Sequence, residues 1–152
     1  AADVSPSTFF RYFTNKEALL IPDQLMDPII ETFINAPAEL SPVGAYRLAV
    51  GQMFTGISNT AWEPERARQN LMYTLPEARG ALYTQYIDTI DQITDALATR
   101  LNLPADDLRL RTTAGAITGV IMASLHGAAM NPEDIYRALD FLDAGLPLKD
   151  LD

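Results

Sequence analysis

Cysteine is absent from this 152-residue chain, and histidine occurs once, as His126. The absence of cysteine excludes disulfide bonds, thiolate nucleophiles and cysteine-containing metal sites. No run of about 18 apolar residues occurs, so the sequence has no candidate membrane span and predicts a soluble protein. A glycine-rich phosphate loop, a nucleophile elbow and a metal-binding motif are missing too, so we expect no enzyme activity, no cofactor and no metal site.

Basic residues are few, with 11 Lys and Arg against 20 Asp and Glu and a formal net charge of -9. This balance disfavours general attraction to nucleic acid, because DNA binding requires Lys and Arg to neutralise phosphates. The charge is uneven, however. Within residues 1–20, Asp3 and Glu17 balance Arg11 and Lys16, so the rest of the chain carries the whole excess. An acidic body joined to a neutral head is compatible with a local DNA contact.

The spacing of apolar residues and the position of helix caps predict an all-α fold. A capping side chain stands directly before a proline at Ser5, Ser41 and Asn131, which is typical of a helix start. No segment shows the strict alternation of apolar and polar residues that strands require. The expected helices are residues 5–13, 15–36, 41–57, 63–75, 76–101, 106–130 and 131–145.

Two of these helices carry regular patterns. In residues 76–101, apolar side chains step by three or four positions and form one stripe. They are Leu82, Tyr86, Ile90, Ile93, Leu97 and Leu101. In residues 106–130, small residues recur every four positions, which lets the backbone of a partner helix approach closely. They are Gly115, Gly119, Ala123 and Gly127.

Residues 4–20 carry the most specific pattern, Val-Ser-Pro-Ser-Thr-Phe-Phe-Arg-Tyr-Phe-Thr-Asn-Lys-Glu-Ala-Leu-Leu. It resembles the recognition helix and following turn of the TetR (tetracycline-repressor) family of transcriptional regulators. In that family, Val-Ser is followed by two variable residues, Thr, an apolar residue, an aromatic residue, two polar or aromatic residues, Phe, a short turn and Lys-Glu-x-Leu. The resemblance implies a ligand-responsive regulator, expected to be a repressor, that binds a palindromic operator as a dimer. A small molecule would release it from the DNA.

The resemblance assigns DNA contacts to this segment. In a helix-turn-helix protein the first residues of the second helix reach base edges in the major groove, which places Pro6 and Ser7 at the tip. Phe10 departs from the usual Tyr, so it lacks a hydroxyl for phosphate. The expected DNA contacts are Ser5, Pro6, Ser7, Thr8, Phe10, Arg11, Tyr12 and Lys16.

Two domains follow from the resemblance. Residues 1–20 would be the remnant of a helix-turn-helix domain, and residues 21–152 a ligand-binding and dimerisation domain. The family's first helix and most of its second would precede Ala1. We therefore expect further residues upstream, and poor DNA binding by this segment alone. The N-terminus has no signal-peptide pattern, which favours a cytoplasmic location.

The ligand site is expected among the helices of the larger domain. Bulky, adaptable apolar side chains are candidates for its wall, although ordinary core packing explains each of them more simply. They are Met53, Trp62, Met72, Tyr73, Tyr83, Tyr86, Ile90 and Met122. A looser resemblance to a branch of the family with Thr-Phe-Phe-Arg-Tyr-Phe implies a small lipophilic effector, such as an acyl-CoA-like molecule.

The last two helices are expected to form the homodimer, because in the TetR family they pair with their copies in a four-helix bundle. The expected interface residues are Gly115, Gly119, Ala123, His126, Gly127, Ile135, Leu139 and Leu142. A catalytic His126 would need a partner that the sequence does not place, so a buried or interfacial structural role is the simpler interpretation.

Other interpretations stay open. Asp88, Asp91 and Asp95 share a helix face and could bind a hard cation, although a solvated acidic face explains them more simply. A helical enzyme would lack any recognisable chemistry. A ligand-sequestering or protein-interaction module without DNA binding would explain the acidic body, but would leave the recognition-helix pattern as a coincidence.

Overall fold

The computed structural model describes residues 23–57, 59–126 and 130–149. Within these ranges the chain is all-α, as predicted, with no strand. The elements are α2 (Asp23–Asn35), α3 (Pro42–Gly56), α4 (Asn59–Thr74), the 3-10 helix η2 (Pro76–Ala78), α5 (Arg79–Leu101), α6 (Leu108–Leu125) and α7 (Pro132–Asp143). None of the helices in the described ranges is long and apolar enough to cross a membrane. The segment that contains the expected DNA contacts lies outside the described residues.

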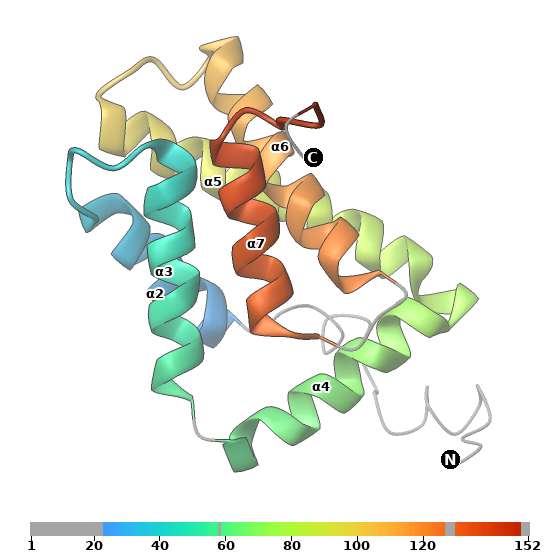
Figure 1. Ribbon diagram of the computed structural model, residues 1–152. Helices are drawn as coiled ribbons and strands as arrows, with labels where there is room; N and C mark the ends of the chain where they lie inside the picture. Colours follow the sequence, from blue (N-terminus) through green and yellow to red (C-terminus); the bar gives the residue numbers. More distant parts are fainter. Residues whose placement is uncertain (1–22, 58, 127–129, 150–152) are drawn as a thin grey trace.

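Five helices close into a ring. α2 packs on α3, α3 on α7, α7 on α6, α6 on α5, and α5 back on α2. α4 makes fewer contacts and crosses one end of the ring, where it packs on α5 (Figure 1). The ring therefore encloses the core, and α4 covers one of its ends.

The centre of the ring is a continuous apolar core. Phe33 of α2, Leu97 of α5, Ile117 of α6 and Leu139 of α7 are fully buried in it. The ring of Phe33 meets the ring of Tyr46 from α3 edge to face, with centroids 5.5 Å apart. Burial of each such side chain contributes about 1.5–3 kcal/mol. All five ring helices thus depend on the same core.

The predicted caps at Ser41 and Asn131 are confirmed. Ser41 Oγ accepts from the Gly44 amide at 2.9 Å, and Asn131 caps α7 through the Glu133 amide. Ser41 Oγ also donates to Asp143 Oδ1 at 2.6 Å, so the start of α3 is joined to the end of α7. These caps require only neighbouring residues, which is why the sequence alone locates them.

Three predicted boundaries are wrong. α4 begins at Asn59 and runs through Pro64, which the sequence analysis placed at a helix start. α6 begins at Leu108 and ends at Leu125, well before residue 130, and Gly127 just beyond it has low helix propensity. Leu101 of the predicted stripe is 41% exposed, because it is the last residue of α5 and the backbone turns at Asn102 with φ of 51°.

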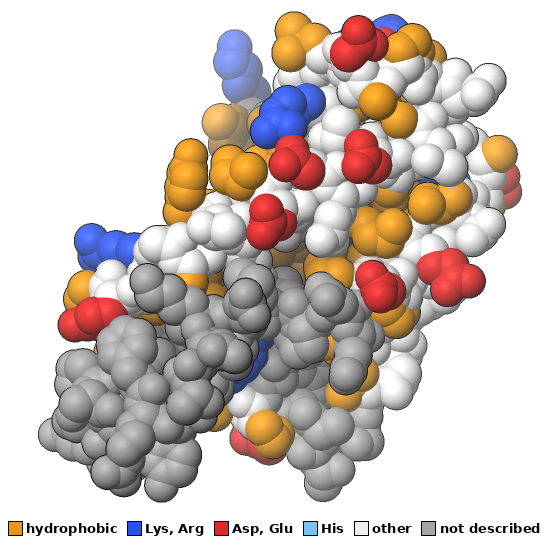
Figure 2. Space-filling view, turned by 180° about the vertical axis from the view of Figure 1, so that it is seen from behind, with side chains coloured by type: hydrophobic (Ala, Val, Ile, Leu, Met, Phe, Trp, Pro, Cys, Tyr) orange, Lys and Arg blue, Asp and Glu red, His pale blue; other side chains and the backbone are white. Residues whose placement is uncertain are grey.

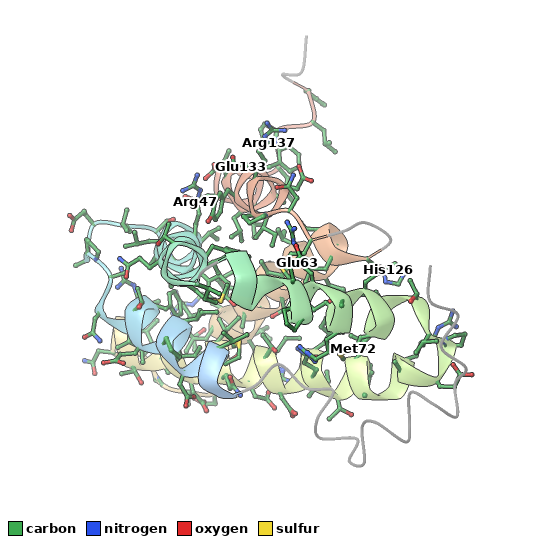
Figure 3. All side chains as sticks on the ribbon, turned by 90° about the horizontal axis from the view of Figure 1, so that it is seen from below. Arg47, Glu63, Met72, His126, Glu133 and Arg137 are labelled. Carbon is green, nitrogen blue, oxygen red and sulfur yellow. The ribbon has the colours of Figure 1, made fainter. Side chains whose placement is uncertain are left out.

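Contacts near the surface hold α3 against α7. Arg47 Nε lies 2.5 Å from Asp140 Oδ1, and the guanidinium of Arg47 stands 5.1 Å from the centre of the Tyr136 ring. Tyr136 in turn meets Phe54 edge to face. Figure 3 shows Arg47 on the side of α3 that turns toward α7. Because both charged groups are partly exposed, the aromatic packing contributes more here than the ion pair.

Arg100, in the last turn of α5, joins α5 to the end of α2. Its Nη1 donates to the carbonyl oxygen of Ala36 and its Nη2 to that of Pro37, each at 2.6 Å. The guanidinium also approaches three neighbouring carbonyl oxygens at 3.4 Å. The last carbonyl groups of a helix lack partners within the helix. Arg100 therefore supplies donors and a positive charge where α2 needs them.

We expect Arg100→Met to lower the free energy of unfolding by about 2–3 kcal/mol, since hydrogen bonds from a charged donor contribute about 1.5–3 kcal/mol. Urea denaturation followed by circular dichroism measures this change. The control is Arg111→Met, which removes an exposed ion pair with Asp91 and is expected to cost less than about 1 kcal/mol. Equal effects of the two substitutions would contradict a special role for Arg100.

Candidate ligand cavity

An apolar cavity lies at the end of the ring that α4 crosses. Its volume is about 90 Å³, room for about three water molecules at roughly 30 Å³ each. All six described helices contribute to its wall. The apolar wall residues are Leu25, Met26, Ile29, Val50, Met53, Phe54, Ile121, Leu125, Met130 and Ile135. Such a partly open, mostly apolar space is typical of a small-molecule site.

The polar residues in the described part of the wall carry no formal charge. They are Tyr46, Gln69, Tyr73, Gln85, Tyr86, Thr89 and Thr118. Burial raises the pKa of Tyr46, Tyr73 and Tyr86 above the ordinary value. These phenols therefore stay protonated at neutral pH and keep their hydrogen-bond donors.

Two tyrosines join α4 to α5 at the cavity. Tyr86 Oη donates to Tyr73 Oη at 3.0 Å. Because one hydroxyl hydrogen satisfies this bond, the hydroxyl hydrogen of Tyr73 is left for another acceptor. The Tyr73 ring also meets the ring of His126 edge to face, with centroids 5.9 Å apart. Figure 3 shows His126 beside the later turns of α4.

Thr118 differs from the other buried threonine of the core. Its side chain is 4% exposed and lines the cavity, and its Oγ1 has no hydrogen-bond partner among the described residues. Thr94 is also buried, but its hydroxyl donates to the carbonyl oxygen of Ile90 at 2.7 Å, within its own helix. The same bond four residues back occurs at Thr55, Thr74, Thr84, Thr99, Thr112 and Thr113. An unpaired buried hydroxyl at a cavity wall is a candidate ligand contact.

An open groove of about 470 Å³ lies on the other side of the cavity wall. Gln69, Tyr73, Leu125 and Met130 line both spaces, so the two adjoin. Arg66 of the groove donates to the carbonyl oxygen of Met130 at 3.4 Å, which ties α4 to the residues before α7. A charged group therefore stands outside the cavity wall and not within it.

Three of the candidate ligand residues, Met53, Tyr73 and Tyr86, line the cavity. The rest of the described candidates do not. Met72 packs with Leu82 in a separate small cluster, and Ile90 packs against the main core. Tyr83 and Met122 are 69% and 42% exposed. Trp62 belongs to α4, but its side chain lies outside the described residues.

Helix rotation explains these differences. Successive residues of an α-helix turn by about 100°, so Met122 points well away from its cavity-lining neighbour Ile121. The sequence analysis also missed the contribution of α2, which lines the cavity with Leu25, Met26 and Ile29. A signal for Thr118 was present, because it interrupts an apolar helix face between Ile117 and Ile121.

The expected dimer residues fall into two groups. Gly115, Gly119, Ala123 and His126 are partly or fully exposed on α6, whereas Ile135 and Leu139 are buried within the single chain and leave no surface for a second copy. Leu142 packs partly against the core, and Gly127 lies outside the described residues. Space next to Gly115 and Gly119 is open. The exposed side of α6 is thus the part of the expected interface that is available.

The acidic face of α5 is not a metal site in the described part of the chain. Asp91 Oδ1 lies 2.5 Å from Arg111 Nη1 of α6, and Asp88 and Asp95 are exposed. No group of three His, Cys, Asp or Glu residues that could hold a metal ion occurs among the described residues. Figure 2 shows acidic side chains dispersed over the back of the molecule among exposed apolar ones.

Comparison with known proteins gave one family match. Residues 40–147 match a TetR C-terminal family that is described as the MftR C-terminal domain. The matched range begins just before α3 and ends just after α7. It therefore includes most of the cavity wall, and leaves out α2. None of the curated proteins matches the chain.

We expect Thr118→Val to raise the free energy of unfolding by about 1 kcal/mol, because an unpaired buried hydroxyl costs about 1–3 kcal/mol. Thr94→Val is the matched control. It removes a paired hydroxyl and is expected to lower the free energy of unfolding by about 0.5–1 kcal/mol. Urea denaturation of both variants measures the difference. A loss of stability in Thr118→Val as large as in Thr94→Val would show that the Thr118 hydroxyl has a partner.

Proposed function

This chain belongs to the TetR family of ligand-responsive transcriptional regulators, and from this premise we propose that it is a repressor that binds a palindromic operator as a homodimer. A small molecule that enters the cavity would release it. We further propose that it acts in the cytoplasm, without catalysis and without a cofactor. The helix-turn-helix remnant would be residues 1–20, and the ligand-binding and dimerisation domain residues 21–152.

The observation that carries this proposal is the position of α2. Its first turns line the cavity through Leu25, Met26 and Ile29. In the sequence, α2 comes directly after the recognition-helix pattern of residues 4–20. A molecule in the cavity would therefore touch the helix that leads to the DNA-reading segment.

The anchoring of α2 supports a mechanism. Arg100 holds the C-terminal end of α2 through Ala36 and Pro37, whereas the N-terminal end meets the cavity. An effector that prefers one position of the N-terminal end would tilt α2 about its fixed end. The equilibrium between DNA-binding and released forms then shifts by the difference in the effector's affinity for them.

The exposed side of α6 supports a dimer. Gly119 and Ala123 have small side chains, so another helix can approach the α6 backbone closely on this side. The apolar residues Leu108 and Met122 of the same helix are 77% and 42% exposed. A helix surface that combines small and apolar residues buries favourably against a copy of itself. We therefore assign the dimer contact to α6.

The acidic surface favours a second candidate, a ligand-sequestering or protein-interaction module that does not bind DNA. The net charge of -9 is its main support. It gives no account of the pattern in residues 4–20, so we rank it below the regulator.

Selection of DNA fragments by the complete regulator tests the main proposal. We expect recovery of a palindrome with half-sites about 34–36 Å apart. Lys16→Ala should weaken binding to all sequences and reduce the slope of log affinity against log salt by about 2, one phosphate contact per subunit. Lys149→Ala, the control at the other lysine of the chain, should change neither. Recovery of no sequence above background would favour the second candidate.

Gly119→Glu tests the dimer. We expect it to convert the dimer to a monomer at tens of micromolar protein, because two carboxylates would be buried without partners at the α6 contact. Gly80→Glu is the control, since Gly80 is also an exposed helical glycine with open space around it. Sedimentation velocity measures both. A dimer in Gly119→Glu, with unchanged helical content, would place the interface elsewhere.

A further inference from the structure

We propose that the cavity takes a compact, uncharged molecule that carries one hydrogen-bonding oxygen or nitrogen, and that Thr118 is the residue that selects it. This inference rests on the proposed function only in taking the cavity as the effector site. It goes beyond a lipophilic effector in general, because it names the polar group, the charge and the size of the ligand.

The unpaired hydroxyl of Thr118 is the first argument. A buried polar group without a partner is unfavourable, and it is retained where a ligand completes its hydrogen bonds. Thr118 stands in the wall with Ile121 and Leu125 of the same helix, so a ligand oxygen at this point would have apolar neighbours. Discrimination by such an unpaired buried hydroxyl is strong, because an analogue without the oxygen leaves the hydroxyl unpaired.

The tyrosine pair is the second argument. After Tyr86 has donated to Tyr73, the Tyr73 hydroxyl hydrogen has no acceptor among the described contacts. It offers a donor from α4, whereas Thr118 offers a donor and acceptor from α6. A hydroxyl or carbonyl group is suited to both.

Charge and size limit the rest of the ligand. Among the described residues the wall holds no Asp, Glu, Lys, Arg or His side chain, so a carboxylate or phosphate inside would lack a counter-charge from them. The room of about 90 Å³ is smaller than the roughly 150 Å³ that encloses benzene, so a single substituted ring fills the cavity and reaches into its opening. A long acyl chain would exceed it, and a coenzyme A group would have to lie outside, in the groove that holds Arg66.

Three probes of one shape test the proposal: p-cresol, p-xylene and p-toluate. At neutral pH p-cresol is an uncharged phenol, p-xylene replaces its hydroxyl by a methyl group, and p-toluate replaces it by a carboxylate. We expect the complete protein to bind p-cresol about tenfold more tightly than p-xylene, and p-toluate more weakly than either. Isothermal titration calorimetry measures the three dissociation constants without DNA.

Thr118→Val and its control Thr94→Val test whether the Thr118 hydroxyl causes the preference for p-cresol over p-xylene. We expect Thr118→Val to reduce the preference for p-cresol over p-xylene from about tenfold to about twofold, mainly by weakening p-cresol. Affinity for p-xylene, which makes no hydrogen bond, should be unchanged or slightly higher. Thr94→Val should leave both affinities as they are.

The outcomes separate this inference from the proposed function. Binding of neither uncharged probe, tighter binding of p-toluate, or an undiminished preference for p-cresol in Thr118→Val would each overturn the inference. Tighter binding of a long-chain acyl-CoA than of p-cresol would overturn it too. If the three probes bind as expected but the selection of DNA fragments recovers no sequence, the ligand class is supported and the regulator function is contradicted.

Discussion

The guanidinium of Arg100 holds the end of α2 against the end of α5. The placement of α2 in turn shapes both the ring of helices and the wall of the cavity. α2 completes the ring of helices between α3 and α5, and its other end forms part of the cavity wall. α2 is thus held near its C-terminal end by hydrogen bonds and meets the cavity near its N-terminal end through apolar side chains.

The cavity and the packed core lie next to each other inside the ring. Phe33, Leu97 and Leu139 are fully buried in the core. At the cavity the ring is covered by α4, which packs less extensively, and the wall gains the polar groups of Tyr73 and Thr118. A packed core and a cavity thus share one apolar interior.

Much of the fold could be predicted from local signals. Ser41 and Asn131 mark their helix starts because a cap and the following proline act within one turn. The apolar stripe predicted for α5 is fully buried at Ile93 and Leu97. The start of α4 could not be predicted in this way, because Pro64 fits a first turn equally well and packing decides against it. Of the cavity wall, the residue type indicated Met53, Tyr73 and Tyr86, whereas Thr118 was not expected there although it interrupts an apolar helix face.

The amino-acid sequence by itself determined the all-α class, most of the helix order and the resemblance to a family of regulators, since caps, periodicity and a short motif are properties of neighbouring residues. Tertiary structure decided which side chains face the cavity, because that depends on how each helix is rotated against the others. It also decided that Arg100 reaches Ala36 and Pro37, and that the hydroxyl of Thr118 is buried without a partner. Contacts between residues far apart in the chain have no local signature, and the candidate site is built from them.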